Sequence, residues 1–206
     1  TTLGAYDPSF NGVPGGGITD VVITRYDSTG SNLIYSTYIG GSSTETCHSL
    51  IATENNELYL YGATSSLNFP SDSNSFDNTF NGGTPVYYTS NGSNFTNGTD
   101  IYVAKLSSNG GTLLGSTYLG GSLNDGVNST TSLNYDTLMN NYGDQYRGEI
   151  MLDQYNNCYI SSSSRSSNFP IINGFDNTLN GDQDAVIIKL NTNLSNVYWS
   201  TYLGGD

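Results

Sequence analysis

The sequence is poor in charge, above all in positive charge. Its 206 residues contain only 5 Lys and Arg, against 18 Asp and Glu, which gives a formal net charge of −13. A surface this acidic repels the phosphates of nucleic acids and of anionic membranes, so neither is expected as a partner. No apolar run reaches the roughly 18–20 residues that a transmembrane helix needs. The chain begins Thr1-Thr2 without a signal peptide, as expected for a mature or excised fragment.

Residues that commonly carry catalysis or bind metals are also scarce. His48 is the only histidine, so the chain alone supplies neither a Ser-His-Asp triad nor a pair of metal-binding imidazoles. Cys47 and Cys158 lie far apart and outside any Cys-x-x-Cys motif for zinc. They form either one disulfide or two free thiols, and we favour free, partly buried thiols because small buried cysteines are common. We therefore expect no enzyme activity and no cofactor, with calcium as the one alternative.

The abundant residues are Gly, Ser, Thr, Asn and Tyr, a composition typical of an all-β protein with many turns. One phrase, Ser-Thr-Tyr-aliphatic-Gly-Gly, occurs three times, at 36–41, 116–121 and 200–205. β-Branched and aromatic residues followed by Gly-Gly predict a strand that ends in a turn. Recurrence after about 80 residues predicts a repeat architecture.

Each full repeat contains two predicted hairpins. One hairpin pairs the strand that carries the repeated phrase with the preceding apolar strand, at 21–26, 101–106 or 185–190. The other is predicted over 48–62 and again over 149–161, and both copies lead into Asn-Phe-Pro, where proline ends a strand. Four antiparallel strands in each repeat predict the blade of a β-propeller.

The order of these motifs resembles the bacterial SBBP repeat, a family named for a predicted seven-bladed β-propeller. The resemblance rests on the repeated phrase, on Lys-Leu before it at 105–106 and 189–190, and on Asn-Phe-Pro at 68–70 and 168–170. It covers the whole chain except two insertions, and the first repeat departs from it with Arg25-Tyr26. The resemblance implies a secreted or cell-surface protein of Bacteroidetes-like bacteria, without shared catalytic residues.

Similarity to other propellers also implies that the hairpin at 48–62 is the inner pair of a blade and that the hairpin at 100–119 is the outer pair. The chain then divides into a half blade at 1–42 and blades at 43–121 and 122–206. A closed propeller needs at least about four blades. We therefore expect the remaining blades to come from the same full-length chain or from another chain.

Two insertions, at 84–98 and 122–147, lie in predicted loops, where repeat proteins often carry their binding surfaces. Tyr87, Tyr88 and Phe95 lie among Asn, Ser and Gly in the first insertion. This composition suits recognition of glycans or proteins, and the alternative is that the rings anchor their own loop.

The second insertion contains the only cluster of acidic residues outside the repeated positions, namely Asp125, Asp136 and Asp144. Such loop carboxylates suit calcium better than hydrolysis, since nothing fixes their spacing for acid–base chemistry. No Asp-x-Asp-x-Asp-Gly loop is present to strengthen the calcium hypothesis. Two tripeptides, beginning at Asp27 and Asp136, resemble the O-glycosylation sequon of Bacteroidetes secreted proteins and would place sugars on Ser28 and Thr137.

One basic residue occupies the same strand position in all three repeats, as Arg25, Lys105 and Lys189. A residue repeated in this way is more often structural than functional. An acidic residue begins each of these strands, so we expect local ion pairs with Asp20, Asp100 and Asp184.

The favoured function is therefore a structural or binding β-propeller segment of a large secreted or cell-surface bacterial protein, which displays loops for adhesion or for protein or glycan recognition. The alternatives are an accessory propeller of a secreted glycan-processing enzyme, and a client captured with a secretion or surface complex, such as a type IX secretion substrate.

Overall fold

Antiparallel strands make up almost all of the regular structure, which confirms the all-β prediction. The computed structural model describes residues 1–12, 17–88, 92–128 and 144–205. Within them the strands are β1 (Val21–Tyr26), β2 (Leu33–Ile39), β3 (Glu45–Ala52), β4 (Leu58–Thr64), β5 (Val86–Tyr87), β6 (Asn94–Phe95), β7 (Asp100–Leu106), β8 (Leu113–Leu119), β9 (Glu149–Leu152), β10 (Cys158–Ser164), β11 (Asp184–Leu190) and β12 (Val197–Leu203). A single 3-10 turn, η1 (Asp144–Tyr146), accompanies them in the described part of the chain.

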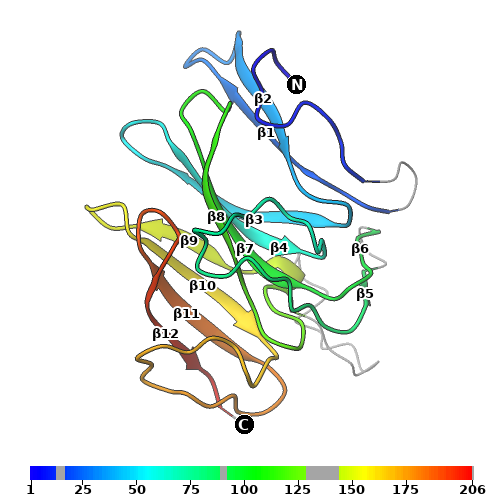
Figure 1. The fold of residues 1–206 in the computed structure, drawn as a ribbon, viewed down its shortest axis with the longest axis vertical. Coiled ribbons are helices and arrows are strands. Elements are labelled where there is room, and N and C mark those ends of the chain that lie inside the picture. The colour runs from blue at the N-terminus through cyan, green and yellow to red at the C-terminus, as the bar shows by residue number, and fades with distance from the viewer. Residues whose placement is uncertain (13–16, 89–91, 129–143, 206) are drawn as a thin grey trace.

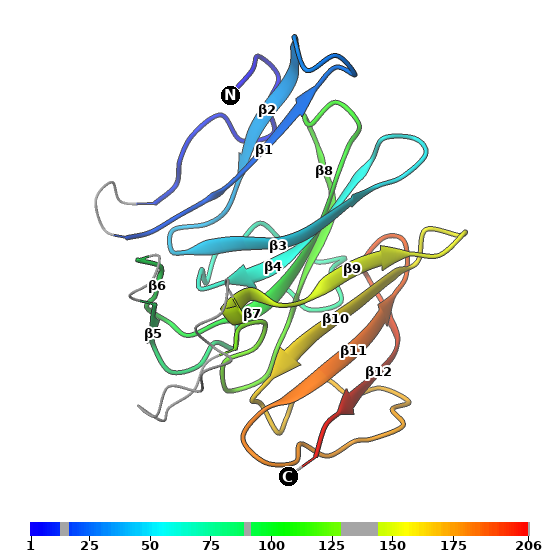
Figure 2. The ribbon, with the colours of Figure 1, turned by 180° about the vertical axis from the view of Figure 1, so that it is seen from behind.

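The strands form two four-stranded antiparallel sheets and two hairpins. The middle sheet has the order β3-β4-β7-β8, and the C-terminal sheet has the equivalent order β9-β10-β11-β12. The hairpin β1-β2 forms a two-stranded sheet at the N-terminal end, and β5-β6 is a small separate hairpin. The three main sheets follow one another along the long axis of the molecule (Figure 1), and β3 and β9 lie on the side that Figure 2 shows.

Three hairpins, β1-β2, β7-β8 and β11-β12, repeat in detail. Each contains one register shift at the same place, between Arg25 and Tyr26, between Lys105 and Leu106, and between Lys189 and Leu190. The register from β4 to β7 matches that from β10 to β11, with Thr64 opposite Asp100 and Ser164 opposite Asp184. The sequence repeat is therefore also a repeat of strand pairing.

The middle sheet is covered on both faces, and β4 is buried at every position. Tyr59 and Tyr61 pack with Ile160 in the core that joins the middle and C-terminal sheets. Leu60 lies in a second core, which joins the middle sheet to β1-β2, and Ile23 lies in it too. Successive strand residues point to opposite faces, so one strand serves both cores. Burial of each such large side chain contributes about 1.5–3 kcal/mol.

The turn at the end of each four-stranded sheet depends on asparagine. Asn56 and Asn156 both adopt φ 61°, a left-handed conformation that asparagine tolerates better than most residues. In the turns of the hairpins β1-β2, β7-β8 and β11-β12 the same conformation occurs at Gly30, at Gly110 and, exceptionally, at Leu194 with φ 60°. Leu194 is fully buried in the core between the middle and C-terminal sheets, which accounts for a bulky residue in a strained turn.

Candidate functional site

The repeated Gly-Gly joins each sheet to the next. The Gly41 N–H donates to Glu45 Oε2 at 3.0 Å, and the Gly121 N–H donates to Asp125 Oδ2 at 2.7 Å. Glu45 begins β3, and Asp125 forms a β-bridge to Ser164 of the C-terminal sheet. In the first two copies of the phrase, the second glycine is thus hydrogen-bonded to a carboxylate that pairs with the following sheet.

The Asn-Phe-Pro motif completes this connection. Asn68 Oδ1 accepts the Ser42 N–H at 2.9 Å, and Asn168 Oδ1 accepts the Ser122 N–H at 2.9 Å. A serine two residues before each asparagine accepts a further backbone N–H, at 2.8 Å for Ser66 and 2.9 Å for Ser166. We call these two sets of contacts the latches: Gly41, Glu45, Ser66 and Asn68 at the first junction, and Gly121, Asp125, Ser166 and Asn168 at the second.

The latches leave no room for a side chain at the second glycine. A Cβ added at Gly41 would lie 2.6 Å from Ser66 Cβ, and one at Gly121 would lie 2.5 Å from Ser166 Cβ. A serine Cβ is bonded directly to the backbone and cannot move aside alone, and Cβ atoms in real proteins do not approach one another this closely. Only glycine therefore fits without a shift of the backbone. The third copy, Gly205, has no atom within 4 Å of such a Cβ among the described residues.

The latch carboxyl groups are buried. Glu45 is 2% exposed, and burial raises its pKa to about 7, with a smaller contribution from the charge of Asp20. Asp125 is fully buried, and burial raises its pKa to about 6 against the effect of its hydrogen bonds. Asp100 lies beside the second latch, and burial followed by the charge of Asp125 raises its pKa to about 8. These groups are held by backbone N–H donors, which suits a structural role.

The predicted metal ligands are not brought together in the part of the chain that the structure describes. Asp125 is part of the second latch, Asp136 lies outside the described residues, and Asp144 begins η1 without a described side chain. The described residues also contain no group of three or more His, Cys, Asp or Glu side chains that could hold a metal ion. Calcium binding by this insertion stays a prediction.

The aromatic residues of the first insertion differ in exposure. Tyr88 is 8% exposed and Phe95 is fully buried, whereas Tyr87 is 62% exposed. The Tyr88 hydroxyl donates to the Asn128 carbonyl at 2.9 Å, and its ring lies 5.6 Å from that of Tyr146. Tyr88 and Phe95 therefore anchor the loop, and Tyr87 is the ring that faces solvent.

These contacts bring the two insertions together. Tyr146, in η1 of the second insertion, contacts Phe95 of the first at 6.4 Å between ring centroids. It also lies 5.3 Å from the His48 ring. Burial lowers the pKa of His48 to about 3, so this imidazole is neutral at physiological pH and extends the aromatic cluster. Tyr146 was not predicted as a site residue, because it is separated from its partners by more than 40 positions of chain.

The ion pairs expected within the repeated strands are wrong. Lys105 pairs with Glu57 at 2.8 Å, and Lys189 pairs with Asp153 at 3.2 Å, both in the turn of the neighbouring hairpin. Arg25 instead donates to the Ser108 carbonyl and to Asn56 Oδ1. A strand separates its two ends by about 3.3 Å per residue, so a basic residue five positions after the aspartate lies out of its reach. The structural role expected of the three cations is retained with other partners.

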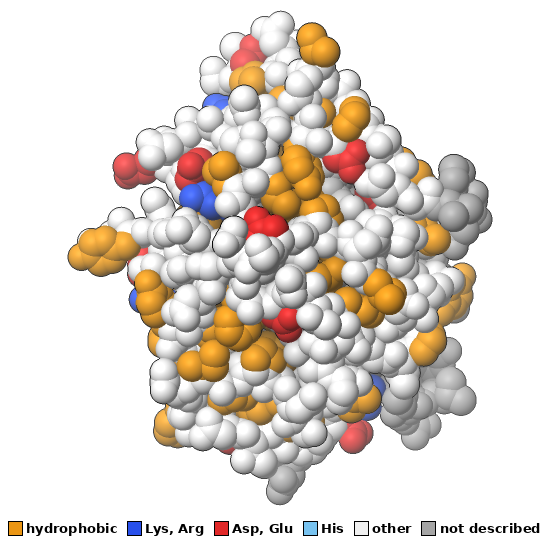
Figure 3. Space-filling model, viewed as in Figure 1, with side chains coloured by type: hydrophobic (Ala, Val, Ile, Leu, Met, Phe, Trp, Pro, Cys, Tyr) orange, Lys and Arg blue, Asp and Glu red, His pale blue; other side chains and the backbone are white. Residues whose placement is uncertain are grey.

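Cys47 and Cys158 are both free, as favoured from the sequence, but the burial differs from the prediction, because Cys47 is exposed and Cys158 is buried. Ser28 is exposed in the turn between β1 and β2, and Thr137 lies outside the described residues. Charged side chains of either sign are sparse on the face drawn in Figure 3.

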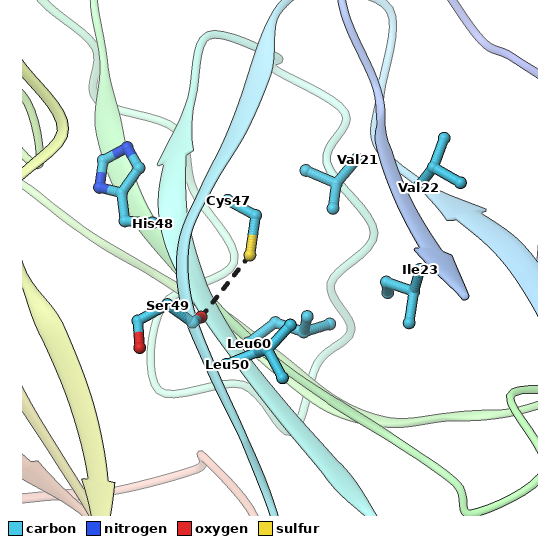
Figure 4. A pocket seen from close by; sticks show the side chains of 8 residues that line it. All are labelled: Val21, Val22, Ile23, Cys47, His48, Ser49, Leu50 and Leu60. Carbon is cyan, nitrogen blue, oxygen red and sulfur yellow. Dashed lines mark hydrogen bonds between the residues drawn. The ribbon is translucent and has the colours of Figure 1, made fainter. Parts of the chain in front are cut away.

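An open groove lies between β1 and β3. It encloses about 450 Å³ and is lined by Val21, Val22, Ile23, Cys47, His48, Ser49, Leu50 and Leu60. In Figure 4, Cys47 lies on the side of β3 that faces β1, and His48 lies on the other side. A second hollow of about 300 Å³ lies farther along β1. It is lined by β1 residues up to Arg25 and, across from them, by residues that include Leu50 and Leu58.

No protein-family model and no curated protein matches this sequence significantly. The helical content of the described residues includes no segment that is long and apolar enough to cross a membrane. The latches were not among the sites predicted from the sequence, although the spacing of four residues from Gly41 to Glu45 and from Gly121 to Asp125 carries their signal.

Proposed function

We propose that this chain is a section of a β-propeller, built as a half blade at 1–42 and blades at 43–121 and 122–206. Three observations support the proposal: the strand order of the two four-stranded sheets, their shared register, and the latches at both junctions. The resemblance to the SBBP repeat supports it too, and implies a secreted or cell-surface bacterial protein. The remaining blades would come from the same full-length chain or from another chain.

The function of such a section is to hold recognition loops on a rigid support, without catalysis of its own. The observation that carries this proposal is the exposure of Tyr87 beside two buried rings, Tyr88 and Phe95. The buried rings fix the β5-β6 hairpin to Tyr146, so Tyr87 is presented with little freedom to lose on binding. An exposed, pre-oriented tyrosine among Asn and Gly suits a glycan ring or a protein surface.

Binding of the full chain to a glycan array and to surface-protein extracts tests this function. Tyr87→Ala should lower the affinity for any ligand found by at least tenfold, because a central aromatic contact commonly contributes 2 kcal/mol or more. Tyr26→Ala removes a similarly exposed tyrosine, 54% exposed, from the β1-β2 hairpin and serves as the matched control. Equal binding by both variants would contradict the proposal that Tyr87 contacts the ligand.

A further inference from the structure

The edge of β1 that faces away from β2 has no partner strand among the described residues. In the middle sheet the equivalent strand, β7, pairs with β4 on that edge, and in the C-terminal sheet β11 pairs with β10. The matching register shifts show that β1, β7 and β11 occupy the same place in their sheets. An unpaired edge of this kind is a template for a further strand.

The surface next to this edge is apolar where its counterpart is covered. Leu50 lies opposite Leu60, and Ile150 lies opposite Ile160, so Leu50 and Ile150 are equivalent positions. Ile150 is 3% exposed because the middle sheet packs on it through the β3-β4 hairpin, with Tyr59 and Tyr61 in the same core. Leu50 is 56% exposed, because the N-terminal sheet has no such pair of strands in the part of the chain that the structure describes.

The tyrosine of the repeated phrase also indicates that two strands are missing beside β1 in the described part of the chain. Tyr118 and Tyr202 donate their hydroxyl groups to the carbonyls of Ser66 and Ser166, which follow β4 and β10. Both rings are fully buried. The equivalent Tyr38 is only partly buried.

We propose that the groove between β1 and β3 binds a β-hairpin of the repeat's own inner-pair type, which adds two strands to β1-β2. This occupant is specified by its chemistry. Its second strand runs antiparallel to β1 and carries large apolar or aromatic residues two positions apart, opposite Ile23 and Arg25. These are the places that Tyr61 and Tyr59 hold opposite Val103 and Lys105 in the middle sheet.

The groove is continuous with an established core. Ile23 and Leu60, which line it, belong to the core between β1-β2 and the middle sheet. The two tyrosine-like side chains of the occupant would extend this core over Leu50 and cover the thiol of Cys47. The inference rests on the proposed stacking of repeat sheets, and it is independent of recognition by Tyr87.

The test adds the missing hairpin and follows the reactivity of Cys47. Tyr6 corresponds to Phe76 in the repeat, so Thr1 corresponds to Ser71, and a second copy of residues 43–70 can be placed directly before Thr1. The added copy carries Cys47→Ser, so that the original Cys47 is the only exposed thiol. We expect its alkylation to be at least tenfold slower in the extended protein than in the original chain.

Matched variants distinguish specific docking from general shielding. Leu50→Glu places a charge in the apolar groove and should restore fast alkylation, and so should Tyr59→Ser with Tyr61→Ser in the added copy. Met151→Glu alters a residue of similar exposure, 62%, on β9 and should leave Cys47 protected.

Two results would overturn the proposal. One is an alkylation rate in the extended protein equal to that of the original chain. The other is protection of Cys47 in the original chain that increases with protein concentration, since this would make a second copy the occupant of the groove. Loss of glycan or protein binding by Tyr87→Ala changes neither result, so the two proposals fail separately.

Discussion

The backbone N–H of Gly121 donates to Asp125 Oδ2 at 2.7 Å, and the Ser166 hydroxyl donates to the same oxygen at 2.8 Å. A single buried carboxylate thus connects the end of the middle sheet to the loop that follows β10. Charge-assisted hydrogen bonds of this kind are about twice as strong as neutral ones. The equivalent contacts at Glu45 make the connection a property of the repeat.

Substitution of the latch glycine should separate the two sheets at this point. The Cβ of Gly121→Ala would lie 2.5 Å from Ser166 Cβ, so the loop must shift and its hydrogen bonds to Asp125 weaken. We expect the free energy of unfolding, measured in urea, to fall by about 2–3 kcal/mol. Gly205→Ala is the matched control, because no atom of the described residues lies within 4 Å of a Cβ there. It should change stability by less than about 0.5 kcal/mol.

Stability should decrease as the pH rises from about 5 to 8. Burial raises the pKa values of Asp125, Glu45 and Asp100 to about 6, 7 and 8, above the values near 4 that they have when unfolded. The folded state therefore binds more protons over this range. The stability that these protons provide is fully present below about pH 4 and is lost as the pH passes the folded pKa values.

Asp125→Asn tests this dependence without removing the latch. The amide oxygen can accept the two bonds now made by Oδ2, and the amide nitrogen takes the place of Oδ1, which has no partner among the described residues. We expect a flatter curve of unfolding free energy against pH, because the variant has no carboxyl group to titrate at this position. The exposed Asp182→Asn is the control for net charge, and a slope reduced equally by both variants would contradict the prediction.

Much of this fold could be predicted from the sequence because its signals are local and repeated. Apolar runs and turn residues placed strands such as Val21–Tyr26 correctly, and the Asn-Phe-Pro motif follows the ends of β4 and β10. The partners of Lys105 and Lys189 could not be found in the same way, because they lie in the adjacent hairpin rather than in the same strand. The contact between Tyr88 and Tyr146 joins two insertions, and no periodicity in the sequence encodes it.

The reactivity of the two cysteines should differ completely. Cys158 is fully buried, and burial raises its pKa to about 12, whereas Cys47 is exposed at the groove. Titration with a disulfide reagent should modify one thiol in the native chain and two after unfolding. Modification of neither thiol before reduction would indicate a disulfide and contradict the structure, and Cys47→Ser should abolish the native signal.

Leu194 should be more stabilising than glycine, although its turn favours glycine. Its φ of 60° costs a non-glycine residue about 1 kcal/mol, while its buried side chain contributes about 2–3 kcal/mol to the core between the two sheets. Leu194→Gly therefore loses more than it gains and should destabilise the chain by about 1–2 kcal/mol. Leu194→Ala keeps the backbone strain and loses most of the burial, so it should be the least stable of the three. Urea unfolding of the wild type and both variants gives the order, and an alanine variant more stable than the glycine variant would show that the turn is not strained.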